Sequence, residues 1–241
     1  MYYFFISLLA CSLGSFVGLG GDIIIIPLLL SLGVSKELIS INTDLTMLTM
    51  TLLSTFIYRK RKLGDFKTAV LIAVGIIPGA SLGVAINSHI GIPTFNLFFI
   101  ILLFILIVFM FLEKKLPKFI LPNWTKPVVG LIIGTVSGLF GLGGAIMLIP
   151  VLLICYGFNQ KQASATTLSL IFISTFVTVS NYYFRGYTDL SYALFMIPGA
   201  LIGSAIGTFF NKKATNKIVS HSFKIILILV LIKQLIMFIT H

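Results

Sequence analysis

Two stretches of the sequence combine paired glycines with a following apolar run, a pattern typical of a helix that is interrupted beside a ligand. Residues 18–27 read GLGGDIIIIP, and residues 141–150 read GLGGAIMLIP. Glycine adopts backbone conformations closed to other residues and lets other groups approach closely. A helix that starts after such a break offers unpaired N–H groups and the positive end of its dipole, which attract anions. The predicted chemistry is therefore anion binding at the two double glycines.

One position in this signature differs in charge between the two copies. Asp22 follows the first double glycine, whereas Ala145 follows the second. An acid at a helix start can simply cap it, which is worth about 1 kcal/mol. Alternatively it is a titratable group beside the substrate, because carboxylates within membranes commonly mark proton or ion pathways. Asp22 is thus the candidate coupling residue, with protons or sodium ions as the candidate coupling ions.

A second polar cluster recurs at matching positions. Asn42-Thr43-Asp44 corresponds to Ala165-Thr166-Thr167 when the two copies are aligned. Scattered serines and threonines usually bond to carbonyls of their own helix or to neighbouring helices. This cluster is instead predicted to face the central cavity and to offer hydroxyl and amide donors to substrate oxygens. The alternative for Asp44 is a place at the membrane interface, near the start of its helix.

The composition places these residues in a membrane. The chain is 58% hydrophobic and only 10% charged, whereas a soluble domain has about 25% charged residues. Stretches of about 18 or more apolar residues indicate membrane spans. The sequence predicts such stretches at the following positions: 38–57, 68–87, 94–112, 162–183, 190–210 and 218–240. With the glycine-broken segments, we expect about ten helical segments.

The chain is predicted to be a duplication. The glycine signature recurs after 123 residues, and one added residue later aligns Arg61 with Arg185 and Asp65 with Asp189. The same register superposes glycines that we expect at helix contacts: Gly75, Gly79 and Gly83 on Gly199, Gly203 and Gly207. The predicted organisation is a first membrane repeat at 1–112, a basic cytoplasmic linker at 113–126 and a second membrane repeat at 127–241.

Basic residues predict the orientation of the repeats, because cytoplasmic loops carry an excess of Lys and Arg. If each glycine-broken stretch forms a hairpin, 13 basic residues lie inside and two outside; if each crosses once, the numbers are 10 and 5. The hairpin is therefore preferred, with the basic loops cytoplasmic and both termini extracytoplasmic. Each half then makes an odd number of crossings, a hairpin followed by three transmembrane helices. The halves are thus inverted repeats, as in many secondary transporters with midplane sites.

These motifs carry a family resemblance. A Gly-Leu-Gly-Gly turn before an apolar run and a proline, repeated in each half with a Thr-bearing segment behind it, resembles the sulfite exporter TauE/SafE family, also called the toluene sulfonate uptake permease group. The resemblance implies a plasma-membrane transporter of small sulfur-containing anions such as sulfite, sulfoacetate or other organosulfonates. The family commonly extends its glycine run by a third glycine, where this chain has Asp22 and Ala145. An ionised Asp22 would repel an anion.

Other classes of function fit the sequence less well. The net charge of +11 comes from short basic clusters between apolar segments. Clusters in such places indicate which loops face the anionic leaflet of the membrane, and they do not indicate nucleic-acid binding. The scattered histidines predict no metal site, and no cofactor is expected. An intramembrane aspartyl protease would need Gly-x-Gly-Asp where residues 19–22 read Leu-Gly-Gly-Asp. A passive anion channel remains the main alternative to a secondary transporter.

The predicted substrate-binding residues are these: Gly20, Gly21, Asp22, Asn42, Thr43, Asp44, Gly143, Gly144, Ala145, Thr166 and Thr167.

Overall fold

The computed structural model describes an all-helical protein, which confirms the predicted fold class. Within the described part of the chain, ten helices follow one another and no strand occurs. Their bounds are α1 Tyr2–Val17, α2 Asp22–Ser31, α3 Lys36–Lys60, α4 Phe66–Asn87, α5 Ile92–Leu112, α6 Thr125–Phe140, α7 Ala145–Cys155, α8 Gln160–Phe184, α9 Ser191–Lys213 and α10 Asn216–Thr240. The described residues are 2–31, 34, 36–87, 92–112, 120–140, 145–184 and 189–240.

Four of the described helices are long and apolar enough to cross a membrane by length and composition. The spans are Phe66–Gly83, Gln160–Ser180, Ser191–Lys213 and Asn216–Ile236. The predicted span at 38–57 lies in α3, which is 25 residues long but more polar. Its apolar residues share the helix with Thr and Asn side chains that are buried against other helices. Large apolar side chains such as Leu194 and Phe104 are exposed on the outer surface, as expected for side chains that face lipid.

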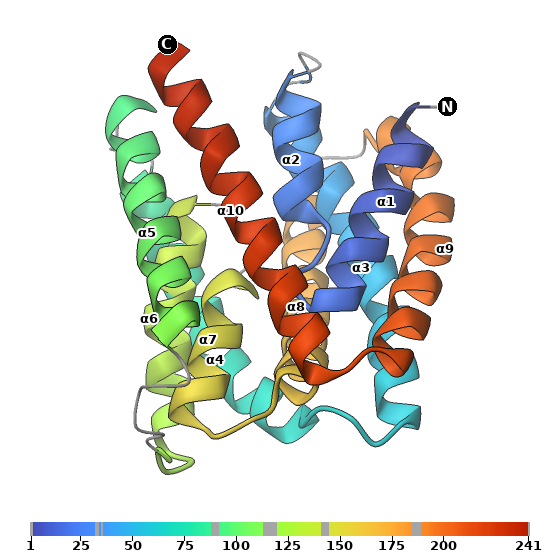
Figure 1. The fold of residues 1–241 in the computed structure, drawn as a ribbon. Coiled ribbons are helices and arrows are strands. Elements are labelled where there is room, and N and C mark those ends of the chain that lie inside the picture. Colours follow the sequence, from blue (N-terminus) through green and yellow to red (C-terminus); the bar gives the residue numbers. More distant parts are fainter. Residues whose placement is uncertain are drawn as a thin grey trace.

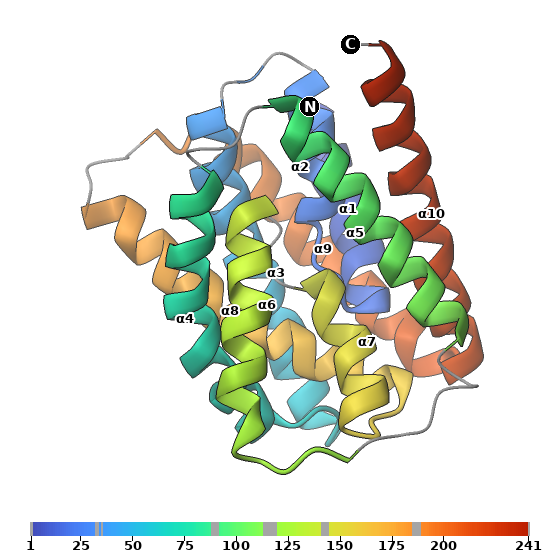
Figure 2. The same cartoon turned by 90° about the vertical axis from the view of Figure 1, so that its left-hand side faces the viewer.

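The first helix of each half packs against the fourth helix of the other half. Figure 1 shows α1 beside α9, and Figure 2 shows α4 beside α6. Glycines make this close approach possible, because an added Cβ on Gly203 would collide with the Leu8 carbonyl oxygen and one on Gly79 with that of Leu131. The prediction that these glycines form helix contacts is confirmed for Gly75, Gly79, Gly199, Gly203 and Gly207.

The third helices of the two halves, α3 and α8, pack against each other in the middle of the bundle. Each also contacts the fourth helix of the other half, α3 with α9 and α8 with α4. Helices α5 and α10 pair with each other along one side of the bundle. The polar segments predicted to face a cavity therefore lie on the two central helices.

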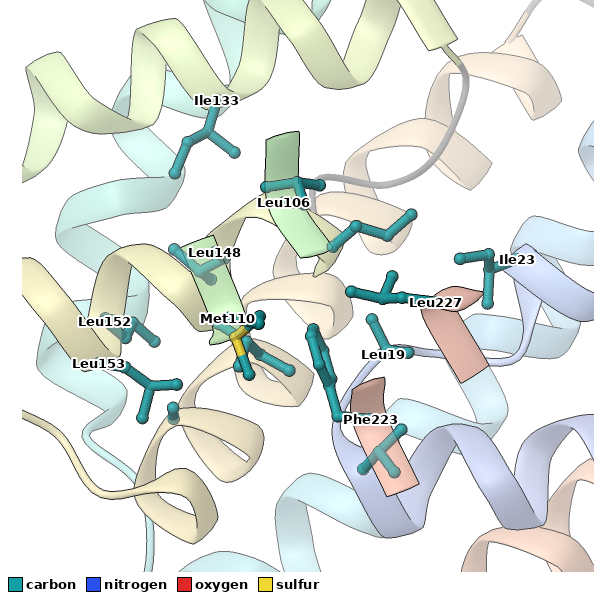
Figure 3. Packing of buried hydrophobic residues seen from close by; sticks show 14 of the residues in the cluster. Leu19, Ile23, Leu106, Met110, Ile133, Leu148, Leu152, Leu153, Phe223 and Leu227 are labelled. Atoms are coloured by element: carbon teal, nitrogen blue, oxygen red, sulfur yellow. The ribbon is translucent and has the colours of Figure 1, made fainter. Parts of the chain in front are cut away.

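Apolar side chains from both halves close the space between the central helices and the α5–α10 pair. Figure 3 shows Leu19 and Ile23, which flank the first double glycine, near Phe223 and Leu227 of α10. The cluster continues through Met110 of α5 and the buried leucines of α7. The first glycine hairpin is thus anchored in a core that both halves build.

The first glycine-broken stretch forms a hairpin. Figure 1 shows α1 running into the bundle, the chain turning there, and α2 returning to the end where α1 began. The beginning of α1 and the end of α10 lie at this same end. The basic ends of α3 and α9 lie at the other end, where Lys161 Nζ also donates to the Lys212 carbonyl at 3.3 Å.

Candidate functional site

The tip of the first hairpin depends on glycine at three positions. Gly18 and Gly20 have φ of +90° and +81°, in the left-handed region that favours glycine. The Gly18 and Leu19 N–H groups both donate to the Gly14 carbonyl, at 2.8 and 3.1 Å. An added Cβ on Gly14 would in turn collide with the Gly20 carbonyl. The returning chain therefore lies directly against the helix that it leaves.

The start of α2 is already occupied by a carboxyl group of the protein itself. The Ile23 N–H donates to Asp22 Oδ1 at 2.9 Å, and the Asp22 side chain is buried. The Gly21 N–H donates to Met47 Sδ at 3.0 Å. The Asp22 carboxylate thus sits where the predicted mechanism places a substrate anion, at the first N–H groups of a helix inside the bundle.

Three helices surround this point. A Cβ added to Gly21 would lie 3.0 Å from both Cys11 Sγ of α1 and Met47 Cε of α3, and one added to Gly20 would lie 3.5 Å from Ile171 Cδ1 of α8. The carboxyl groups of Asp22 and Asp44 are near enough to interact electrostatically. The structure therefore brings together Gly20, Gly21, Asp22 and Asp44 of the predicted set.

The predicted contact Asn42 is engaged with another helix. Its Nδ2 donates to the Asp189 carbonyl at 2.9 Å and to the Leu38 carbonyl at 2.8 Å, while its Oδ1 accepts the Ala193 N–H at 2.7 Å. Since Leu190 provides no side-chain cap to α9, Asn42 supplies that cap from α3. The neighbouring Thr43 hydroxyl donates to the Ile39 carbonyl at 2.6 Å.

The matching residues on α8 lie near the other end of the bundle. The Thr166 hydroxyl donates to the Gln162 carbonyl at 2.8 Å and accepts the Asp65 N–H at 2.9 Å. Thr167 is fully buried, and its hydroxyl has no partner among the described residues. Asn42 and Thr166 thus perform related tasks, each joining a central helix to the segment where the fourth helix of the other half begins.

The second hairpin tip is described only in part. Gly143 and Gly144 lie outside the described residues, and Ala145 is the first residue of α7. Helix α7 is 11 residues long and buries Leu148 and Leu152 in the shared core. The binding roles predicted for Gly143, Gly144 and Ala145 stay predictions.

Sequence reasoning missed several contacts that hold the first hairpin. The Ser164 hydroxyl of α8 donates to the Val17 carbonyl, where α1 ends. The buried Tyr58 hydroxyl of α3 donates to the Ser15 carbonyl at 2.9 Å. These partners are 147 and 43 residues away in sequence. No local signal marks them, although a tyrosine or serine inside an apolar segment does indicate a polar group that needs a partner.

An ionic network joins three helix ends at the basic end of the bundle. Asp65 precedes α4 and accepts hydrogen bonds from the N–H and the hydroxyl of Thr68. The buried Lys126 Nζ donates to the same Thr68 hydroxyl at 2.6 Å and lies 5.6 Å from the Tyr156 ring centre. Partial burial by itself would raise the pKa of Asp65, but the Thr68 hydrogen bonds and the Lys126 charge outweigh it, so this pKa lies below its usual range.

The described residues hold no group of three or more His, Cys, Asp or Glu side chains that could bind a metal ion. The chemistry available around the hairpin consists of helix-start N–H groups, two carboxyl groups and a soft, apolar wall of methionine, cysteine and isoleucine. Such a site offers hydrogen-bond donors to an oxyanion and carboxyl groups that can take up protons.

Comparisons with known proteins identify the family. The chain is 27% identical to the probable membrane transporter protein YunE of Bacillus subtilis (strain 168), over 93% of each chain. It is 28% identical to the probable membrane transporter protein YjnA of the same strain, over 86% of this chain and 91% of that protein. A probable membrane transporter protein of Xylella fastidiosa (strain 9a5c) is 27% identical over 90% of this chain and 87% of its own. No solved structure matches. The family model for the sulfite exporter TauE/SafE covers residues 3–234, and the chain therefore belongs to that family of membrane transporters.

Proposed function

We propose that this membrane transporter moves a small anion, a sulfur oxyanion or organosulfonate, by secondary transport with alternating access. The observation that supports the proposal is the start of α2 inside the bundle, where a buried carboxylate of the protein accepts the Ile23 N–H at 2.9 Å. A helix start that binds one oxyanion can bind another, since the N–H groups and the helix dipole favour any anion of similar shape.

In the proposed mechanism, the substrate takes the place of the Asp22 carboxylate at the start of α2. An ionised Asp22 would both repel the anion and compete for the N–H groups, so that substrate binding and protonation of Asp22 favour each other. Asp44, within electrostatic range of Asp22, adds to the same repulsion. This coupling would let a proton accompany each anion.

Alternating access is supported by the relation between the halves, which we propose are inverted repeats. Figure 1 shows α1 and α6 running in opposite directions, and the pairs α1–α9 and α4–α6 are equivalent contacts across the two halves. In such transporters one repeat moves against the other around a fixed site. We further propose that the chain lies in the plasma membrane, with the basic end cytoplasmic and both termini outside.

Orientation of the repeats can be tested with single cysteines. Lys62 follows α3 and Tyr183 lies near the end of α8; both side chains are exposed. Lys62→Cys and Tyr183→Cys should react with membrane-impermeant reagents from opposite faces of oriented vesicles. Reaction of both from one face would overturn the inverted arrangement.

The function itself is tested with purified protein. A thermal-shift screen of sulfite, sulfate, thiosulfate, sulfoacetate, taurine and small carboxylates should give a hit among the sulfur compounds. Uptake of that compound into vesicles against its gradient, driven by an imposed pH or sodium gradient, would distinguish secondary transport from a passive anion channel. Stabilisation by carboxylates alone would overturn the substrate class.

Asp22→Asn tests the coupling role. Asn caps a helix nearly as well as Asp, so we expect the variant to fold and to bind the anion. Its affinity should no longer depend on pH, and uptake driven by a pH gradient should be abolished. Ala145→Asp is the matched variant, because a carboxylate at the start of α7 should weaken anion binding by repulsion. If Asp22→Asn still accumulates the anion under a pH gradient, Asp22 is a cap and not the coupling residue.

A further inference from the structure

A cavity of about 280 Å³ opens at the basic end of the bundle, away from the start of α2. It is bordered by the end of α3, the α3–α4 loop, the first residue of α4 and one residue of α8. Its lining residues are Arg59, Lys62, Leu63, Gly64, Phe66 and Ser169. The volume exceeds that of a single water by almost an order of magnitude, so the cavity has room for a small oxyanion together with water.

The local structure holds both cations at this cavity. The Arg59 guanidinium carbon lies 4.7 Å from the centre of the Phe66 ring, which orients the side chain by a cation–π contact. Lys62 adopts a left-handed conformation with φ of +54°, which is uncommon outside glycine. Its N–H donates to the Arg59 carbonyl at 2.9 Å. The turn after α3 therefore places two positive side chains beside one opening.

No acidic residue lines the cavity to neutralise these charges. Asp65 follows directly in the sequence, but its carboxylate accepts hydrogen bonds from Thr68 and faces Lys126. Within the described part of the chain, neither Arg59 nor Lys62 forms an ion pair. The cavity thus has a net positive lining.

The cavity reaches a central helix that also contacts the hairpin. Ser169 is only 4% exposed, so its place in the lining shows that the opening extends inward along α8. Two residues further along α8, Ile171 approaches the Gly20 position of the hairpin tip. Side chains two residues apart on a helix point to nearly opposite sides, so α8 itself separates the inner end of the cavity from the wall of the proposed binding site.

The equivalent place in the second half has a different character. In the register that aligns Arg61 with Arg185, Arg59 corresponds to Tyr183 and Lys60 to Phe184. Both aromatic side chains are largely exposed, at 70% and 84%, as is typical of a membrane interface. The second half thus has an aromatic side chain at the position where the first half has the cation of Arg59.

We propose that this cavity is a second anion site, a vestibule in which Arg59 and Lys62 bind a small oxyanion or sulfonate at the basic face before it reaches the hairpin. The identity of the anion rests on the proposed function, whereas the attraction of anions into the cavity does not. The vestibule raises the local concentration of anions at one face of the transporter, because a cleft lined by one sign of charge concentrates ions of the other sign.

The test places a cysteine at the inner end of the vestibule. Ser169→Cys is introduced into full-length protein with Cys155→Ser, and Cys11 is retained because it is fully buried. Reaction rates are measured in detergent with the anionic sulfonatoethyl and the cationic trimethylammonioethyl methanethiosulfonates. We expect the anionic reagent to react about 10-fold faster at low ionic strength, after correction for intrinsic rates. We also expect sulfate to slow the reaction.

Charge variants identify the residues responsible. The quantity compared is the ratio of the anionic to the cationic reaction rate, corrected for intrinsic reactivity. The double variant Arg59→Gln with Lys62→Gln should bring this ratio close to one. Lys60→Gln removes the same type of charge from a residue outside the lining and should leave the ratio unchanged. Arg59→Lys keeps the charge and should keep most of the preference. A ratio that is unaffected by the double variant, or equally affected by Lys60→Gln, would overturn the vestibule. Failure of the thiol introduced by Ser169→Cys to react with either reagent would overturn it too.

Transport measurements separate the two proposals. In vesicles, the double variant should raise the KM for anion uptake at the basic face several-fold with little change in maximal rate. If the labelling preference holds but no sulfur anion is transported by the parent protein, the proposed function fails and the vestibule stands. If transport is normal in the double variant and the labelling preference is absent, the vestibule fails and the proposed function stands.

Discussion

Replacement of Asn42 by alanine tests how the central helix α3 is joined to the second half. The amide of Asn42 is fully buried and makes two hydrogen bonds to the start of α9, one to the Asp189 carbonyl and one from the Ala193 N–H. Asn42→Ala removes both and leaves the N–H of a fully buried residue, Ala193, without its partner. The variant should therefore loosen the contact between α3 and α9.

The expected loss of stability follows from these contacts. Each hydrogen bond between membrane helices contributes about 0.6 kcal/mol on average and about 1.7 kcal/mol at most. A buried N–H left without an acceptor costs about 1–3 kcal/mol. Together these give about 2–4 kcal/mol. For a chain of this size, 1 kcal/mol corresponds to about 2–4 °C in melting temperature, so we expect a decrease of roughly 4–16 °C.

The assay is thermal unfolding of purified protein in detergent, followed by binding measurements on the protein that remains folded. Thr49→Ala is the matched control, because the Thr49 hydroxyl donates only within its own helix, to the Thr46 carbonyl at 2.8 Å. It should change the melting temperature by no more than about 1–2 °C. If Asn42→Ala melts like Thr49→Ala, the hydrogen bonds to α9 do not stabilise the fold and the reasoning is wrong.

Two further predictions concern the hairpin and the basic end. Gly14→Ala should destabilise the protein by more than about 2 kcal/mol, because the new methyl group collides with the Gly20 backbone. Gly157→Ala is the control, because its new methyl group has no neighbour within 4 Å. It should cost about 1 kcal/mol, only because the backbone there is left-handed, with φ of +67°. Equal melting temperatures for the two variants would contradict this. Because the pKa of Asp65 is lowered in the folded protein, the ionised carboxylate stabilises the fold above its unfolded pKa of about 4. That stabilisation should be lost as the pH falls through the folded pKa. Melting curves from pH 6 to pH 3 should show this loss of stability in the parent protein. The loss should be shifted to higher pH in Lys126→Gln and absent in Asp65→Asn. If the parent and Asp65→Asn lose the same stability at acid pH, Asp65 is not the group responsible.

Much of the scaffold could be predicted from the sequence because it depends on local patterns. Apolar length marks the spans, and the double glycine marks the break between α1 and α2, where Gly18 and Gly20 adopt positive φ. The regular spacing of Gly199, Gly203 and Gly207 predicts a helix contact. This spacing does not identify the partner helix, because any helix with a suitable groove could pack against these glycines.

The partners could not be predicted, because they depend on how the halves interlock. Nothing near Asn42 indicates that its amide caps α9, 147 residues away at the Asp189 carbonyl. Likewise, Ser164 meets the end of α1 only because α8 crosses the first hairpin. Because Asn42, Thr43 and Asp44 are adjacent in the sequence, this cluster is predicted to form one site. On the helix its members face different neighbours, so Asn42 meets α9 while Asp44 interacts with Asp22.

Two of the positions where the halves differ in charge lie close to the proposed anion route. Asp22 corresponds to Ala145 and Asp44 to Thr167, so both carboxyl groups near the hairpin come from the first half. The cations of the proposed vestibule also come from the first half, at the end of α3. Glycines that shape the scaffold recur in both halves. The inverted repeats that we propose would allow two equivalent conformations, whereas charges in one half would make those conformations respond differently to protons and anions. We therefore expect the direction and the coupling of transport to depend on residues of the first half, and the shape of the scaffold to depend on both halves.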